Sequence, residues 1–442
     1  MPASTHSDED YASSPVPEDA RTSWRGIFFA TLGIATALFF AQIASIITVR
    51  FGVVAALIGL AYGYCVSTFV GVLLVRRSIE TGFGINIWAR TVLGYRGAGL
   101  FSLAYGVACL TYFVAEASIM GASLQALFPE VPHALIYVCL VFVMLPLVWS
   151  GMKVLARFQT ISLVLFVGFV VWAIRNALGV PVAGASLPEI QLAADPFTSL
   201  LEVLGIVNGL AFIIGLVTAD YARFVRKQEL RAGTVFVGAL FPAFCYGITG
   251  ILGIWFAVKM RESNPGVYFV SLLGAGGIIF ACTTQLRINL GNIYSGTVAF
   301  VNAVEHLFGV SVSRRVVIVV FCAAAATVLI SDGTRLLASA LNYIGMSMAC
   351  FVTLLLVDQF CVGRSRDVSD AMPHVIKNWR WTGLSSCLIA TLFGVCIGNA
   401  SLFPSLYQWA TPVSVVVQAI LFLGIESYSN RRRGMSSHAA SS

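Results

Sequence analysis

Charged residues are scarce in this chain. Asp, Glu, Lys and Arg together make up 11% of its 442 residues, whereas an average soluble domain contains about a quarter. Hydrophobic residues make up 58%, and the mean hydropathy is +0.88. This composition excludes an ordinary soluble globular protein and indicates an integral membrane protein.

The motifs of soluble enzymes are missing as well. The sequence holds no P-loop, no HExxH, no GxSxG and no dinucleotide fingerprint at a strand-to-helix junction, which argues against ATP-driven pumping and redox chemistry. Inside the apolar runs there is no His/Cys/Asp cluster with the pattern of a metal site, and no nucleophile paired with a base. We therefore expect no enzymatic activity and no cofactor beyond a coupling ion.

Long apolar runs fill most of the chain instead. A run of about 20 apolar residues can cross the roughly 30 Å hydrocarbon core as an α-helix, and these runs do not alternate as β-barrel strands do. The sequence predicts twelve transmembrane helices, over residues 26–49, 51–75, 98–127, 133–151, 157–177, 199–219, 233–258, 267–299, 314–331, 334–358, 381–401 and 408–428. They form one transmembrane domain over residues 26–428, between tails of residues 1–25 and 429–442. The first tail lacks the features of a signal peptide.

Positive charges are distributed unevenly over the predicted loops. If the N-terminus is cytoplasmic, 21 of the 27 lysines and arginines fall on the inner side, five on the outer side, and Arg287 within the membrane. Since cytoplasmic loops are enriched in Lys and Arg, we expect a multi-pass protein of the plasma (inner) membrane with both tails cytosolic. No basic run alternates with aromatic residues, so the net charge of +7 reflects topology and no nucleic-acid partner is expected.

Two ionisable side chains lie in the middle of predicted spans, Glu116 and Arg287. Charges at that depth cost at least about 2.5–3.5 kcal/mol and normally face a bundle interior or a cavity. Helical spacing aligns Glu116 with Tyr105, Cys109 and Tyr112 on one stripe. A carboxylate one turn from an aromatic ring suits a flat ligand rich in N–H groups, because the ring stacks and the carboxylate accepts hydrogen bonds.

The stretch around Arg287, ACTTQLRINLGNIYSG (281–296), is very polar for a membrane helix. Helical geometry places Thr283, Thr284, Arg287, Gly291 and Tyr294 on one side and Gln285, Asn289 and Asn292 on another. Neither side suits lipid, so we expect a ligand or ion site. The alternative is a structural Glu116–Arg287 ion pair with amides that join helices, contacts worth only about 0.6 kcal/mol on average.

The first and sixth runs carry features of transporter helices. Gln42 is a lone amide near the middle of the first run, and Gly209 and Gly215 bracket residues 210–214 in the sixth. Glycines at such positions either permit an unwound segment, whose carbonyls can bind ions, or let helices pack closely.

Several segments together carry a resemblance to a known family. They are PVPEDART (15–22), ETGFGINIWARTVLGYRGA (80–98), GLVTADYARFVRK (215–227), the threonine pair at 283–284, and Asp358 in LLLVDQF. Their order and spacing resemble the nucleobase–cation symporter family of the purine/cytosine permease type, from about residue 16 to residue 428.

The resemblance implies an all-α polytopic fold: a five-plus-five inverted repeat with discontinuous helices 1 and 6, followed by two C-terminal helices. It implies a substrate site between helices one, three, six and eight, and a sodium ion held by backbone carbonyls of helices one and eight and by helix-eight hydroxyls. The matching sodium ligands are Thr283 and Thr284. The candidate substrate residues are Gln42, Tyr112, Glu116, Phe212, Gln285 and Asn289.

Two departures from the family pattern concern stacking and coupling. The helix-three tryptophan is absent, and Tyr112 lies where the stacking ring belongs. Gln285, Leu286 and Arg287 follow the hydroxyl pair in place of asparagine. A fixed guanidinium beside the expected sodium position can replace the ion electrostatically, so sodium coupling and proton coupling through Glu116, opposed by Arg287, both stay open.

The sequence thus predicts a secondary active importer of a nucleobase or a related planar nitrogen heterocycle, driven by a sodium or proton gradient through alternating access. Its expected partners are the heterocycle, the cation and the lipid bilayer. The alternative is a channel or a membrane sensor for a similar small molecule. No signalling domain is visible, and the polar residues gather at one depth instead of lining a continuous file.

Overall fold

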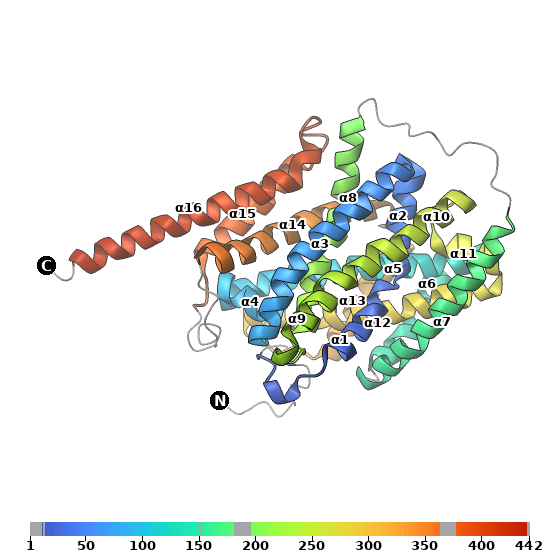
Figure 1. The fold of residues 1–442 in the computed structure, drawn as a ribbon, viewed down its shortest axis with the longest axis horizontal. Coiled ribbons are helices and arrows are strands. Elements are labelled where there is room, and N and C mark those ends of the chain that lie inside the picture. The colour runs from blue at the N-terminus through green and yellow to red at the C-terminus, as the bar shows by residue number, and fades with distance from the viewer. Residues whose placement is uncertain are drawn as a thin grey trace.

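The computed structural model describes residues 11, 14–149, 152–180, 196–331, 333–362 and 377–439, and this part of the chain is helical without strands. Figure 1 shows the helices packed along one another. Within these described residues, six helices are long and apolar enough to cross a membrane alone, and there are seven if one bent pair is taken as a single span. Helices also occupy the other predicted runs, but they are shorter or more polar, so the count of twelve stays a prediction.

The helices follow the order of the predicted runs. The first five runs correspond to α1 with α2, α3, α5, α6 and α7, and the next five to α8, the helix that ends in α10, α11 with α12, α13 and α14; α15 and α16 come last. Their bounds are α1 Trp24–Ala35, α2 Leu38–Phe51, α3 Val53–Thr81, α4 Ile85–Leu93, α5 Tyr95–Leu127, α6 His133–Trp149, α7 Met152–Leu178, α8 Pro196–Ala222, α9 Leu230–Gly233, α10 Ile251–Met260, α11 Pro265–Leu273, α12 Ala275–Phe308, α13 Arg314–Ile330, α14 Leu337–Val357, α15 Trp381–Ile397 and α16 Ala410–Ala439. The seventh run lies in a continuous helix, Lys227–Met260, which contains α9, π-helical segments over Thr234–Leu240 and Ala243–Gly250, and α10.

Contacts between helices recur in the two halves of the bundle. The pair α5–α6 has a counterpart in α12–α13, α1–α7 in α8–α14, and α7–α12 in α14–α5. Successive spans alternate in direction, so a repeat of five spans makes the second half start from the opposite side. This agrees with the five-plus-five inverted repeat that the resemblance implies. The helices α15 and α16 pack on each other and on α14, at one side of the bundle (Figure 1).

The first span is broken, as expected. The helices α1 and α2 meet at 43°, and Thr36 and Ala37 lie between them. The Thr36 hydroxyl lies 3.2 Å from the carbonyls of Leu32 and Gly33, to which it donates, and such bonds compete with continuation of a helix. A break at membrane depth is tolerated only where the protein satisfies the freed backbone groups.

The sixth span is not broken in the described residues. The helix α8 runs without interruption from Pro196 to Ala222, so the expected discontinuity of helix six is not observed. Its glycines serve close packing instead. A Cβ at Gly209 would lie 2.7 Å from the Leu341 carbonyl oxygen of α14. Glycine permits both unwinding and close packing. The sequence alone therefore could not tell which of the two occurs at Gly209.

The predicted run 267–299 contains two helices and not one. Pro265 starts α11, and the side chain of Asn264 caps it by accepting from the Gly266 N–H at 2.9 Å. Gly274, with φ of +57°, ends α11, in a backbone conformation that favours glycine. The next helix, α12, is 34 residues long and carries the polar stretch 281–296 in its middle.

The segment before α1 is bound to two connections on the predicted cytoplasmic face. The Val16 N–H donates to the Gly82 carbonyl, between α3 and α4, at 3.0 Å. The Trp24 N–H donates to the Glu229 carboxylate, just before α9, at 2.7 Å. Figure 1 shows this segment close to α9 and α1. The described part of the predicted N-terminal tail is therefore part of the packed body.

The contact of Gly209 with α14 can be tested by stability. We expect Gly209→Ala to lower the melting temperature of the purified protein, because forcing a methyl group against the Leu341 backbone costs about 1–3 kcal/mol. The control is Gly168→Ala on α7, where an added Cβ meets nothing within 4 Å. Alanine is the better helix former, so this control should be neutral or stabilising. Equal melting temperatures for the two variants would contradict the packing role.

Candidate functional site

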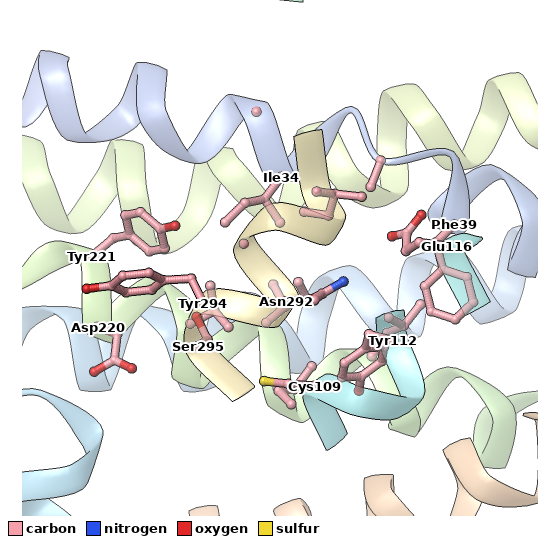
Figure 2. Close-up of a pocket in the computed structure, with 18 of the residues that line it drawn as sticks. Ile34, Phe39, Cys109, Tyr112, Glu116, Asp220, Tyr221, Asn292, Tyr294 and Ser295 are labelled. Carbon is pink, nitrogen blue, oxygen red and sulfur yellow. The ribbon is translucent and has the colours of Figure 1, made fainter. Parts of the chain in front are cut away.

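A cavity of about 260 Å³ lies among α1, α2, α5, α8 and α12 (Figure 2). These helices belong to the first, third, sixth and eighth predicted spans, between which the resemblance implies a substrate site. Seven of the lining side chains are aromatic, and six others are polar or charged: Glu116, Asp220, Arg223, Arg287, Asn292 and Ser295. Drug-sized ligands take about 300–1,000 Å³, so the cavity suits a smaller molecule.

The deep end of the cavity, at Tyr112 and Glu116, combines aromatic rings with a carboxylate. Phe39 and Tyr112 meet edge to face, with ring centroids 6.0 Å apart, and the Tyr112 hydroxyl donates to the Gly209 carbonyl of α8. Glu116 lies one turn further along α5, and Figure 2 shows it beside Phe39. The whole predicted stripe of α5, Tyr105 to Glu116, lines the cavity.

Gln285 joins Glu116 to the break in the first span. Its amide nitrogen donates to the Glu116 carboxylate, and its amide oxygen accepts from the Leu38 N–H at 3.0 Å. Leu38 begins α2, so this N–H is one of those that a helix start leaves unpaired. Gln285 is fully buried and does not line the cavity. The structure therefore places it behind Glu116 as a support.

Arg287 lines the cavity and bonds hydroxyl groups instead of an acid. One terminal nitrogen donates to the Thr36 hydroxyl at the break, and the other donates to the Ser162 hydroxyl of α7 at 3.2 Å. Within the described residues no ion pair joins it to Glu116, although the two charges are close enough to interact. The ion pair considered as an alternative from the sequence is thus not formed.

The sodium position that the resemblance implies lies at the hydroxyls of Thr283 and Thr284 on α12. Thr283 and Thr284 do not line the cavity, and Thr284 is buried. Both lie one turn before Arg287 on α12, on neighbouring positions of the helix surface. Because like charges repel strongly in a buried site, the fixed guanidinium of Arg287 disfavours a sodium ion at these hydroxyls.

Three other candidates lie away from the cavity. Asn289 is fully buried, and its oxygen accepts from the Asn292 amide at 3.2 Å, so Asn292 is the amide that faces the cavity. Gln42 is buried one turn beyond Phe39. Phe212 packs against a separate hydrophobic cluster. The periodicity of each helix was visible in the sequence, but the rotation of one helix against its neighbours was not.

The other end of the cavity lies at the C-terminal end of α8, where no site residues were predicted from the sequence. Asp220, Tyr221 and Tyr294 line it there (Figure 2). The Asp220 carboxylate accepts from the Ile85 N–H at 2.8 Å, at the start of α4, where the helix dipole favours an anion. Asp220, which lies near the end of a predicted span, was not among the site residues predicted from the sequence. Its place in GLVTADYARFVRK was the signal that could have found it.

Comparison with known families gives one match, which covers most of the chain. Residues 15–420 match the model of a family described as permeases for cytosine/purines, uracil, thiamine and allantoin. Among curated protein sequences, none matches this chain.

Solved transporter structures share the fold. The inward-facing conformation of Mhp1 superposes with a TM-score of 0.73 at 14% identity, covering 94% of each chain. Mhp1 in a closed conformation with bromovinylhydantoin bound, described as a nucleobase-cation-symport-1 family transporter, has a TM-score of 0.68 at 15% identity, covering 95% of this chain and 96% of that one. A Na+-coupled sialic acid symporter has a TM-score of 0.59 at 12% identity, covering 94% and 90%.

The bridging role of Gln285 predicts a stability effect. Gln285→Met should lower the melting temperature clearly, because it leaves the Leu38 N–H and the Glu116 carboxylate without a buried partner, at about 1–3 kcal/mol each. The matched control is Gln418→Met on α16, a fully buried glutamine whose amide nitrogen donates to the Ser386 hydroxyl at 3.1 Å. A Gln285→Met variant as stable as this control would rule out the bridge.

Proposed function

Because the chain belongs to the family of permeases for cytosine/purines, uracil, thiamine and allantoin, we propose that it imports a nucleobase or a related planar nitrogen heterocycle. It is a multi-pass membrane transporter and not an enzyme. The proposed mechanism is secondary active transport by alternating access, coupled to a cation gradient. The proposed membrane is the plasma (inner) membrane, with the tails of residues 1–25 and 429–442 in the cytosol.

The observation that carries this proposal is the combination of aromatic rings and a carboxylate at the deep end of the cavity. A heterocycle there would stack against Tyr112 or Phe39, while its N–H groups donate to the Glu116 carboxylate. Asn292 adds a side-chain amide, which can both donate and accept. A flat ring with several ring nitrogens satisfies all three groups.

The cavity supports an arrangement open toward the cytoplasm. It extends from Glu116 to Arg223 and Phe224, just after α8, on the side where the positive charges concentrate. On the opposite side, Arg50 at the end of α2 forms an ion pair with Glu202 of α8 at 2.6 Å. The higher TM-score against the inward-facing conformation of Mhp1 than against its closed conformation agrees with this proposal.

Two cations are candidates for coupling. A symporter of this fold is Na+-coupled, which supports sodium. The buried Glu116 carboxylate in the cavity supports a proton instead, because a carboxylate at membrane depth can carry a proton between the two sides. A channel or a sensor for the same ligand is the rival function.

Ligand binding gives the first test. A thermal-shift screen of the purified protein against nucleobases, hydantoins and related heterocycles should identify a stabilising ligand. Glu116→Gln should weaken its binding about tenfold to hundredfold, because a hydrogen bond to a charged group contributes about 1.5–3 kcal/mol. The control is Glu426→Gln, a buried glutamate of α16 that does not line the cavity. Unchanged binding by Glu116→Gln would remove Glu116 from the substrate site.

Accumulation separates transport from the rival functions. In proteoliposomes with an imposed cation gradient, the ligand found in the screen should rise above its external concentration, and collapse of the gradient should release it. A channel would only equilibrate the ligand, and a sensor would bind it without uptake. Either of those results would refute coupled transport while leaving the binding site intact.

A further inference from the structure

Arg287 lies where the break of the first span meets two other helices. Its terminal nitrogens donate to Thr36, which caps α1, and to Ser162 of α7, and the side chain is 1% exposed. The C-terminal end of a helix carries a partial negative charge that favours a cation. The guanidinium of α12 therefore supplies a positive charge at the end of α1 and links three helices through one side chain.

The backbone oxygens that a broken helix offers to an ion are engaged by protein donors here. The Ile34 carbonyl accepts from the Ala37 N–H at 3.0 Å. The Ala35 carbonyl accepts from the Thr249 hydroxyl at 2.7 Å. In transporters with broken helices, such carbonyls coordinate sodium. In this protein two carbonyls of the last turn of α1 accept hydrogen bonds from the protein itself, and the Arg287 guanidinium reaches the Thr36 hydroxyl beside them.

We propose that Arg287 is a built-in cation, which takes the position between the α1 break and α12 where the resemblance implies sodium. Substrate binding then needs no sodium at this position. A bound ion can dissociate on the other side of the membrane and so couple transport to its gradient. A guanidinium stays in place and stays charged, so it cannot do this. The role of Arg287 stands on its own contacts. Its consequence for coupling rests on the proposed function, for which it leaves the proton as the coupling cation.

Melting temperatures in two salts test this inference without any substrate. Purified full-length wild-type protein should melt at the same temperature in sodium chloride and in choline chloride of equal concentration, and so should Arg287→Lys, which keeps the charge. Arg287→Ser should melt lower in choline chloride and recover progressively as sodium rises, because an ion that binds only the folded state stabilises it in proportion to the logarithm of its concentration.

The matched control is Arg90→Ser, a buried arginine of α4 that lies outside the cavity. It should lower the melting temperature equally in both salts. A sodium-dependent rise of the wild type would overturn the inference, and so would an Arg287→Ser variant that does not respond to sodium. If Arg287→Ser does not fold, the wild type and Arg287→Lys still decide the question.

Substrate affinity gives an independent measurement. The dissociation constant of the ligand found in the screen should be unchanged for wild type when choline replaces sodium. A weakening of about tenfold or more in choline would overturn the inference. A screen that finds no ligand would count against the proposed function alone, because the melting comparison in the two salts requires no ligand.

Discussion

The need to satisfy every backbone polar group at membrane depth governs this structure. In hydrocarbon each unsatisfied group costs several kcal/mol, yet the first span is interrupted between Ala35 and Leu38. Three side chains from distant parts of the sequence make the interruption possible. Thr249 donates to the end of α1, Gln285 accepts from the start of α2, and Arg287 bonds Thr36 between them. The break is therefore a property of the assembled bundle.

The same side chains connect the break to the cavity. Gln285 bonds both Leu38 and Glu116, so a shift of α2 against α12 changes what the carboxylate can bind. A carboxylate has two oxygens and about four lone pairs, so Glu116 can accept from a ligand while it still accepts from Gln285. Binding at the cavity and the geometry of the first span are thus joined through a single amide.

The sequence predicted the parts of the fold that depend on one segment at a time. The apolar runs located the helices, and the i, i+4 and i, i+3 spacing from Tyr105 to Glu116 identified a stripe that lines the cavity. The parts that depend on neighbouring helices were missed. The resemblance implied a discontinuous helix six, but α8 is continuous and packs against α14 at Gly209. Which amide of α12 faces the cavity depends on the rotation of that helix, which periodicity does not fix.

The binding of the N-terminal segment has a mechanical consequence for opening and closing. Val16 is tied to the α3–α4 connection and Trp24 to Glu229 before α9, and α1 starts at Trp24 itself. Moving α1 away by itself would break these two bonds. Any movement of α1 therefore either carries the α3–α4 connection and the segment before α9 with it or gives up these contacts.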